Sequence, residues 1–246
     1  MEGSVTLQTS RYQTGKLFPV QHGVGLVELL VAMAIGLLLT AGIIQIFSGS
    51  RQTYRVQEDL SHIQENGRFA LIQLGNIVRM AGFKTDPTDT LTFATGAITG
   101  TETTGGPDQV SVFFQGESDG TTFDCLGNPV AASATVVNTF SINSNSLRCA
   151  SSSGTQDLVE NVQDMQITYG VDANGTGSAN YYVNASSVTD WSQVVSLHVS
   201  LLLRSQEDNL APVAQTYQYN GATTTAADRR LRAVFNTTIA LRNRLP

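Results

Sequence analysis

The feature that most constrains the fold is a long apolar run near the N-terminus. No ionisable side chain occurs in the 22 residues from Leu29 to Ser50. As a helix rising about 1.5 Å per residue, this run would span about 33 Å, close to the roughly 30 Å of bilayer hydrocarbon. A buried helix of this length without a charge would be unusual in a soluble protein. The run therefore predicts one membrane-spanning helix at about residues 27–48.

A secretory signal peptide is the first alternative. Such a peptide has an apolar region of about 7 to 15 residues, followed by small residues at the cleavage site. The run here is longer, and the residues after it, SGSRQTYRVQEDLSHIQ (48–64), contain no clean small-x-small site. We therefore expect the span to be retained in the protein.

One acid, Glu28, stands at the start of the apolar run. Burying its charge in hydrocarbon would cost a few kcal/mol or more without a partner. Either the segment does not span a membrane, or Glu28 has a partner, or another protein recognises Glu28. A simpler alternative places Glu28 in the headgroup layer, where an acid costs little.

The polar segment that follows keeps a helical period. Apolar or small residues recur in alternating steps of four and three, which indicates one narrow helix stripe. Gly82 is a plausible end for this helix. We therefore expect one helix over residues 24–82, with its first half in lipid and its second half amphipathic. The predicted stripe consists of Val56, Leu60, Ile63, Gly67, Ala70, Leu74, Ile77 and Ala81.

After Gly82 the composition favours strands and turns. Segments rich in β-branched and aromatic residues, several of them alternating, are separated by Gly, Asn, Asp and Ser clusters. The sequence therefore predicts an α+β protein, in which a long N-terminal helix packs on an antiparallel β-sheet domain with long loops (83–246). The predicted strands are 91–95, 109–115, 165–171, 194–204 and 231–242, with a hairpin-like segment at 138–149; the predicted loops are 99–108, 151–154 and 172–180.

Little in the sequence points to catalysis or to nucleic acid. The net charge of -6 provides no basic footprint, so we expect no nucleic-acid partner. His22, His62 and His198 are scattered, and no nucleophile elbow, phosphate loop or HExxH pattern occurs. We therefore expect a protein that is not an enzyme and has no cofactor.

Two smaller features concern metals and thiols. Asp172, Asn174 and Thr176 have the spacing of the start of a calcium loop, but position twelve, where a bidentate Glu belongs, is Val183. A polar turn is the preferred interpretation, with weak calcium binding as the alternative and no metal expected. Cys125 and Cys149 are too few for a zinc site by themselves, and their pairing would suit an oxidising compartment.

The N-terminal pattern of Gly23, Val24 and Glu28 before an uninterrupted apolar helix resembles the class III signal of type IV pilins and type II secretion pseudopilins. The resemblance implies that residues 1–23 are a leader, which prepilin peptidase removes after Gly23 before methylating the new terminus. The family usually has Phe after the cut, and Val24 departs from this. Glu28 would then pair with the Val24 ammonium of a neighbouring subunit and set its register.

Further segments resemble the PilW family of large minor pilins. They are residues 51–83, ENVQDMQITYGVD (160–172), Asp190–Trp191 with the strand that follows, and the ending RRLRAVFNTTIALRNR (229–244). The segment between about 84 and 155, which we take as a loop, resembles the family least. In an exported domain Cys125 and Cys149 are expected to form a disulfide, with two free buried thiols as the alternative.

The resemblance implies a structural role in a type IV pilus. Minor pilins prime pilus assembly and can sit at the tip, first in the bacterial inner membrane as single-pass proteins with a periplasmic domain, then on the pilus at the cell surface. The implied partners are other minor pilins, the major pilin, prepilin peptidase, a tip adhesin, the inner-membrane assembly platform and lipid. The alternatives are a J-type minor pseudopilin of a type II secretion system or a membrane-tethered periplasmic binding domain.

Overall fold

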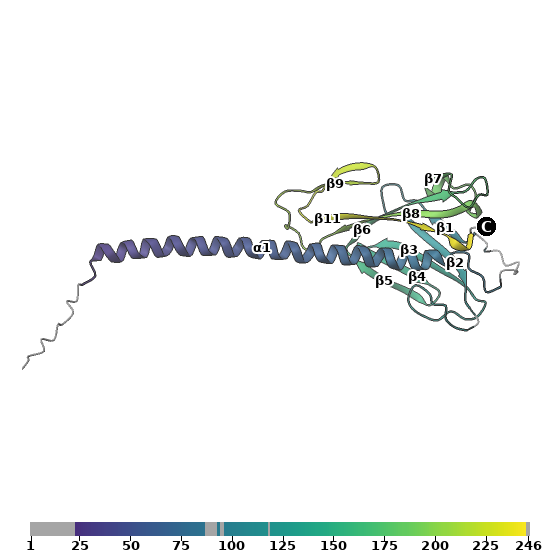
Figure 1. The fold of residues 1–246 in the computed structure, drawn as a ribbon, viewed down its shortest axis with the longest axis horizontal. Helices are drawn as coiled ribbons and strands as arrows, with labels where there is room; N and C mark the ends of the chain where they lie inside the picture. The colour runs from purple at the N-terminus through teal and green to yellow at the C-terminus, as the bar shows by residue number, and fades with distance from the viewer. Residues whose placement is uncertain (1–22, 87–92, 94–95, 118, 245–246) are drawn as a thin grey trace, which may run out of the picture. The chain divides into compact units, whose positions relative to one another are not determined.

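The structure, a computed structural model, describes residues 23–86, 93, 96–117 and 119–244. The chain forms two compact units, residues 1–50 and residues 51–246, and each is described by itself. The described part of the first unit is the first half of helix α1, which spans Leu26–Arg79. The second unit contains the rest of α1 and all the strands (Figure 1).

The second half of α1 buries a single stripe. Ile63, Gly67, Ala70 and Leu74 are buried as predicted, but Leu60 is 39% exposed and Ile77 is only half-buried. The predicted steps of four and three average 3.5 residues, whereas a straight helix turns every 3.6, so such a stripe drifts by about 20° every seven residues. The buried face therefore moves to Gly75 and Val78 near the end of the helix.

Helix α1 ends at Arg79, three residues before the predicted end at Gly82. Gly82 has a φ of 76°, which favours glycine, and its N–H donates to the carbonyl of Phe113 at 2.9 Å. The Phe83 carbonyl in turn accepts from the Gln115 N–H at 2.9 Å. Hydrogen bonds to strand β2 thus hold the chain where it leaves the helix.

A five-stranded antiparallel sheet follows, with its strands in the order of the chain. Four strands of this sheet lie within the segment between about 84 and 155, so that segment is not a single loop as predicted, and the predicted loop at 99–108 begins inside a strand. The alternation of apolar and polar residues is typical of such strands, and in β2 (Gln109–Gln115) Val110, Val112 and Phe114 all point inward. Of the strand predicted at 91–95, only Phe93 lies among the described residues. The strands are β1 (Ile98–Thr101), β2 (Gln109–Gln115), β3 (Thr135–Asn143), β4 (Ser146–Ser151) and β5 (Gly154–Glu160).

The second sheet has four antiparallel strands in the order β11-β8-β6-β7. Three of them coincide with predicted segments, and the alternating residues Val195, Leu197, Val199 and Leu201 of β8 are all buried. The strands are β6 (Val162–Val171), β7 (Tyr181–Val183), β8 (Val194–Arg204) and β11 (Arg232–Ala240), and a separate hairpin joins β9 (Thr216–Tyr219) to β10 (Ala222–Thr225). Three short 3₁₀ turns complete the described elements, at Ala185–Ser187, Trp191–Gln193 and Arg242–Arg244.

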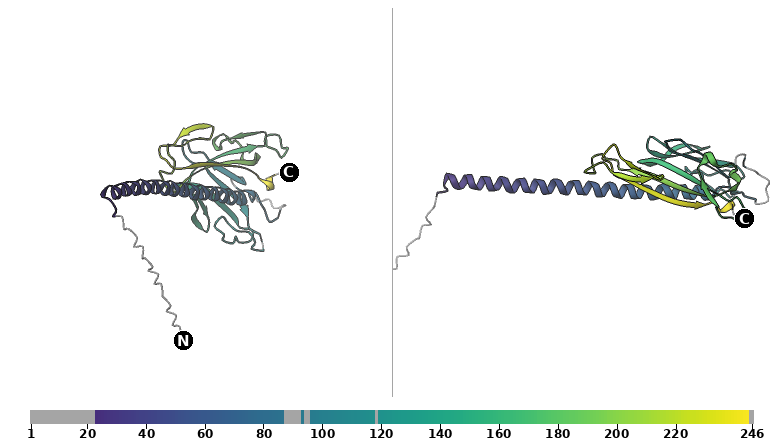
Figure 2. Two further views of the ribbon diagram at one scale, coloured as in Figure 1. Left: turned by 60° about the vertical axis from the view of Figure 1, so that its left-hand side comes forward. Right: turned by 90° about the horizontal axis from the view of Figure 1, so that it is seen from above.

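One hydrophobic core joins the two sheets and the second half of α1. Strand β6 contacts β2, β3 and β4 of the other sheet, and the buried stripe of α1 joins the same cluster. Figure 2 shows the strands gathered along the second half of the helix. Trp191 packs edge-on against the buried ring of Tyr169, with ring centroids 4.9 Å apart. The α+β class and the packing of the helix on an antiparallel sheet domain are confirmed.

Candidate assembly site

The first candidate site is the start of α1. Gly23 and Val24 precede the helix, and its first turn is closed by the Leu29 N–H, which donates to the Gly25 carbonyl at 3.1 Å. Glu28 lies in that first turn, where the helix dipole favours a negative charge. Gly23, Val24 and Glu28 are all exposed. Residues 1–22 of the predicted leader, with His22, lie outside the described residues.

This arrangement places the predicted cleavage bond one helical turn before the acid. A side chain at Gly23 would meet no atom within 4 Å, so the backbone there is open to an enzyme. Cutting after Gly23 would create an ammonium on Val24, four residues from Glu28. The cut, the methylation and the role of Glu28 in subunit register stay predictions.

The surface that follows is continuously apolar. The large hydrophobic side chains between Val24 and Phe47 are all at least half exposed, from 52% at Val31 to 77% at Leu26. Helix α1 is long and apolar enough to cross a membrane, with a mean hydropathy of 2.4 over its 18-residue window. Apolar surface of this extent requires lipid or other protein to cover it.

Gly36 and Gly42, the two glycines inside the predicted span (27–48), face open surroundings. Side chains at Gly36 or Gly42 would meet nothing within 4 Å, so no contact within the chain requires glycine at either position. The Thr40 hydroxyl donates to the Gly36 carbonyl at 2.8 Å, which satisfies its own polar group inside the helix. Two interpretations of these glycines are open. They let neighbouring helices pack closely, or they let this helix loosen locally.

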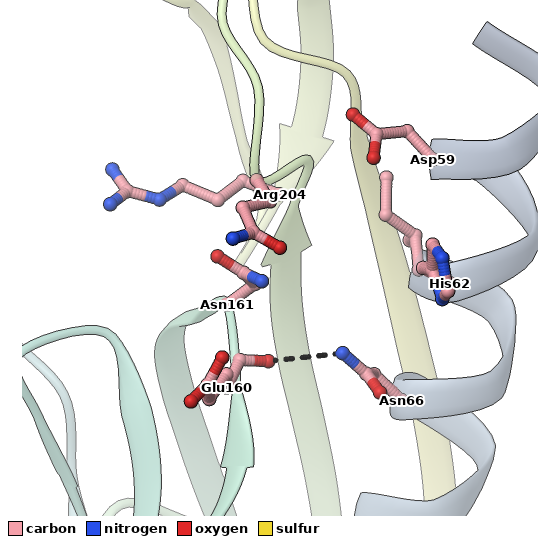
Figure 3. Close-up of a pocket in the computed structure, with 8 residues that line it drawn as sticks. Asp59, His62, Asn66, Glu160, Asn161 and Arg204 are labelled. Carbon is pink, nitrogen blue, oxygen red and sulfur yellow. Dashed lines mark hydrogen bonds between the residues drawn. The ribbon is translucent and has the colours of Figure 1, made fainter. Parts of the chain in front are cut away.

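A polar pocket of about 210 Å³ lies where α1 meets the ends of β5 and β8 (Figure 3). The Asn66 amide donates to the Glu160 carbonyl at 3.3 Å and closes one side. Asp59 Oδ2 and Arg204 Nε are buried without a hydrogen-bond partner among the residues described. The guanidinium of Arg204 points away from the helix. The pocket has a polar lining, and sequence reasoning missed it because its helix residues lie about 100 or more positions before the strand-end residues that complete it.

The predicted disulfide between Cys125 and Cys149 is confirmed, with Cα atoms 6.4 Å apart. It attaches the segment between β2 and β3 to strand β4. The neighbouring Asp124 accepts from the Asn128 N–H at 2.9 Å and from the hydroxyls of Ser151 and Ser153. Burial raises the pKa of this carboxyl, but these hydrogen bonds outweigh burial and hold the pKa below its ordinary value. The sequence did not predict these hydrogen bonds of Asp124.

The candidate calcium loop is folded around its own main chain. Asp172 accepts from the N–H groups of Asn174, Thr176 and Gly177 at 3.3, 3.1 and 2.7 Å. Although burial raises the pKa of Asp172, these hydrogen bonds lower it overall. Such a turn accounts for the acid without an ion. Weak calcium binding remains a matter for calorimetry.

The structure describes two of the three histidines, His62 and His198. His198 Nδ1 lies 3.1 Å from the Thr238 hydroxyl on the neighbouring strand, so its ring has a partner, and His62 lines the polar pocket. Across the described part of the chain, no three or more His, Cys, Asp and Glu side chains come together in a group that could hold a metal.

Comparisons with known proteins match both ends of the chain. Residues 19–44 match the prokaryotic N-terminal methylation motif, and residues 130–243 match the type IV pilus-assembly protein W family. Among solved structures, a type IV-like pilin from Thermus thermophilus is similar, with a TM-score of 0.44 and 19% identity over 78% of this chain and 99% of that one. No curated protein matches.

The methylation motif at the start of an apolar helix, which is a candidate membrane span, and the sheet domain on the second half of that helix are the features of a type IV pilin-like protein. Within that class, residues 130–243, a little under half of the chain, are similar to the type IV pilus-assembly protein W family. The match to a family of pilus-assembly proteins supports the expectation that the chain is not an enzyme. The resemblance noted at residues 51–83 lies outside both matches.

Proposed function

We propose that this protein is a minor pilin that helps to prime assembly of a type IV pilus and takes a position at the pilus tip. The observation that supports this most is the combination of two matches in one chain. The methylation motif lies at the start of the apolar helix, and most of the sheet domain matches the PilW family. A subunit anchored by such a helix can wait in the membrane and then move into a filament without refolding. Its apolar surface is covered by lipid in one state and by other helices in the other.

Its proposed partners follow from the two halves of the chain. The apolar helix would pack against other minor pilins and the major pilin, after prepilin peptidase has cut between Gly23 and Val24. The sheet domain would face the periplasm, and its loops would contact neighbouring minor pilins, the assembly platform and a tip adhesin. Residues 1–23, 24–82 and 83–246 would be the leader, the helix and the exported domain.

Glu28→Ala tests this proposal at the residue that would align the subunit. We expect the mature chain to begin at a methylated Val24 in both wild type and variant, because the cut precedes the acid. Pilus number should fall strongly in the variant, because the Val24 ammonium of the neighbour loses its partner. Mass spectrometry of the membrane-extracted chain and electron microscopy of pili measure the two outcomes.

Glu28→Asp is the matched control, since it keeps the charge. Normal piliation in Glu28→Ala would contradict the role of Glu28 in register. A chain that still begins at Met1 in a strain with active prepilin peptidase would contradict the processing. Full piliation after deletion of the gene would contradict the minor-pilin function itself.

A further inference from the structure

The polar pocket of Figure 3 has a second hollow beside it on the surface of α1. The second hollow, of about 420 Å³, is lined by side chains of α1, and His62 lines both hollows. All the lining residues belong to the unit of residues 51–246, so both hollows lie within one compact unit. We call the two hollows together the acidic groove, and define it by Tyr54, Glu58, Asp59, His62 and Asn66 of α1 and Glu160 at the end of β5.

Three carboxylates border the acidic groove. They belong to Glu58, Asp59 and Glu160, and none of them forms an ion pair with another described residue of the chain. Asp59 also faces the strand ends across the pocket (Figure 3), and its Oδ2 is buried without a hydrogen-bond partner in the described part of the chain. A buried acceptor without a donor costs free energy, so a donor that enters the groove would be bound favourably.

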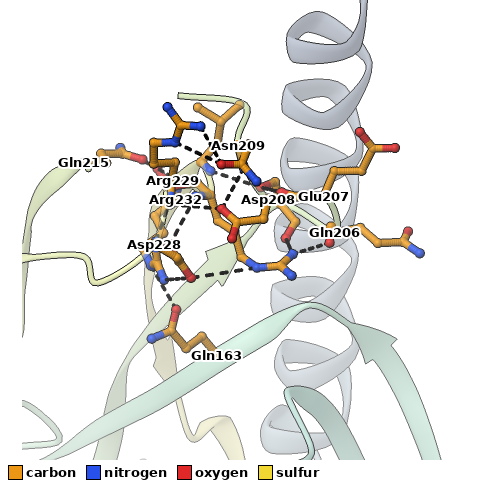
Figure 4. A network of polar contacts seen from close by, with 12 residues as sticks. Gln163, Gln206, Glu207, Asp208, Asn209, Gln215, Asp228, Arg229 and Arg232 are labelled. Atoms are coloured by element: carbon orange, nitrogen blue, oxygen red, sulfur yellow. Dashed lines mark hydrogen bonds and ion pairs between the residues drawn. The ribbon is translucent and has the colours of Figure 1, made fainter. Parts of the chain in front are cut away.

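Arg204 is the only lysine or arginine among the described residues that line the groove, and it does not neutralise these acids. Its guanidinium points away from the helix (Figure 3). Burial lowers the pKa of Arg204, and so do the nearby Arg230 and Arg232, whereas Asp228 opposes this. Asp228 and Arg232 belong to a separate polar network, in which Arg232 donates to Asp228 at 2.6 Å (Figure 4). The groove therefore keeps its negative charge.

We propose that the acidic groove receives a basic side chain, an arginine or a lysine, from a neighbouring protein subunit. The basic group donates to Asp59 Oδ2 and is attracted by the charges of Glu58 and Glu160. Tyr54, which is 72% exposed, offers an aromatic face to the same cation. That the partner is another subunit of the pilus rests on the proposed function, whereas binding of the basic group does not.

Two observations favour a side chain over a metal ion. The described residues bring no three or more His, Cys, Asp and Glu side chains together in a group that could hold a metal. Glu58 and His62 are exposed on the surface of α1, so a side chain that projects from a neighbouring surface can reach the groove.

The test titrates the full chain, labelled with ¹⁵N in detergent micelles, with N-acetyl-arginine amide. The control probe is N-acetyl-citrulline amide, which has nearly the same shape but no charge. We expect the arginine probe to shift the signal of the Asn66 side-chain amide saturably. The citrulline probe should bind about tenfold more weakly, because hydrogen bonds between charged groups are stronger. Added salt should weaken binding of the arginine probe, because the attraction is screened.

Asp59→Asn should abolish the difference between the two probes, and Glu58→Gln should reduce it. Glu65→Gln is the matched control, because Glu65 is an exposed acid of the same helix that lines neither hollow. Equal binding of both probes to the unsubstituted chain would overturn the proposal. The absence of a saturable shift would also overturn it, because it would indicate a groove that holds only water. If Asp59→Asn fails to fold, the probe comparison and Glu58→Gln decide the question.

The number of pili tests the identity of the partner. Asp59→Asn should lower this number, and Glu65→Gln should leave it unchanged. Binding of the arginine probe together with normal piliation in Asp59→Asn would contradict a pilus subunit as the source of the basic side chain. Full piliation after deletion of the gene would instead contradict the proposed function, and the titration would still decide whether the groove binds a basic group.

Discussion

At the scale of single residues, buried acids divide into two kinds. Asp124 and Asp172 have pKa values below the ordinary range, because hydrogen bonds from hydroxyl or main-chain N–H groups outweigh their burial. Burial raises the pKa of Asp108, although the N–H groups of Ile167 and Thr103 oppose it. Asp108 is only 4% exposed and ties the 102–108 loop to β6. The structure therefore predicts opposite pH responses from different buried carboxyls.

Asp108→Asn tests the raised pKa. The ionised carboxyl is disfavoured in the folded protein, so Asp108 lowers stability at neutral pH. This cost disappears as pH falls through the raised pKa toward the unfolded value of 3.8. The stability of wild type relative to the variant should thus increase as pH falls from 7 toward 4. Urea unfolding of both chains across this range measures the difference, and a constant difference would contradict the raised pKa.

At the scale of elements, the contact between α1 and β11 depends on a missing side chain. Gly67 lies on the buried stripe, and a Cβ there would come within 2.7 Å of Phe235 Cζ. The sequence pattern identified Gly67 as a core-facing position, but it did not reveal that an aromatic ring from β11 lies against it. A helix interior normally prefers alanine to glycine by about 1 kcal/mol, so this glycine is kept for packing.

Gly67→Ala should therefore destabilise the protein by about 1 to 3 kcal/mol despite its better helix propensity, because the added methyl group overpacks the contact. Gly75→Ala on the same helix is the matched control. Its Cβ would lie 3.4 Å from the flexible end of Arg79, so it should be neutral or stabilising. Thermal unfolding of both variants in detergent gives the comparison. Equal changes in thermal stability for the two variants would contradict the prediction, because they would show that the Phe235 ring moves aside without destabilising the protein.

The Cys125–Cys149 disulfide acts at the same scale, since it joins a segment of irregular structure to β4. Replacing both residues by alanine should lower the free energy of unfolding by about 3 kcal/mol, the loop-entropy value for a closed loop of about 25 residues. Urea unfolding of the variant and of wild type with and without reductant measures this. A variant as stable as oxidised wild type would contradict the prediction.

At the scale of the whole molecule, the boundary of the compact unit has a practical consequence. Residues 51–82 belong to the same compact unit as the sheets, and the α1 stripe from Ile63 to Val78 forms part of their core. The exposed apolar surface between Val24 and Phe47 belongs to the other unit. Water solubility and folding therefore depend on different halves of one helix.

Two truncations separate these requirements. A chain that begins at Arg51 should be soluble and folded, because it keeps the buried stripe and loses the apolar surface. A chain that begins at Phe83 should aggregate or fail to fold, since Leu74, Val78 and their neighbours no longer cover the sheets. Circular dichroism and size-exclusion chromatography distinguish the two. A soluble, cooperatively folded chain from Phe83 would contradict the shared core.

The sequence by itself determined the features that depend on local periodicity. The apolar run, the stripe on α1 and the alternating strands β2, β6, β8 and β11 follow from residues a few positions apart, so their patterns are visible in the chain. The methylation motif and the two cysteines are equally local signals. The start of α1 can therefore be predicted as a site from the residues around Gly23 and Glu28 alone.

Only the tertiary structure decided how distant segments meet. The ring of Phe235 on Gly67, the polar pocket beside Asp59 and the network of polar contacts around Arg232 (Figure 4) join residues far apart in sequence. Arg232, for example, donates to Gln163, 69 positions away. Such contacts depend on the order and register of the strands, which long-range packing determines and which no local pattern records.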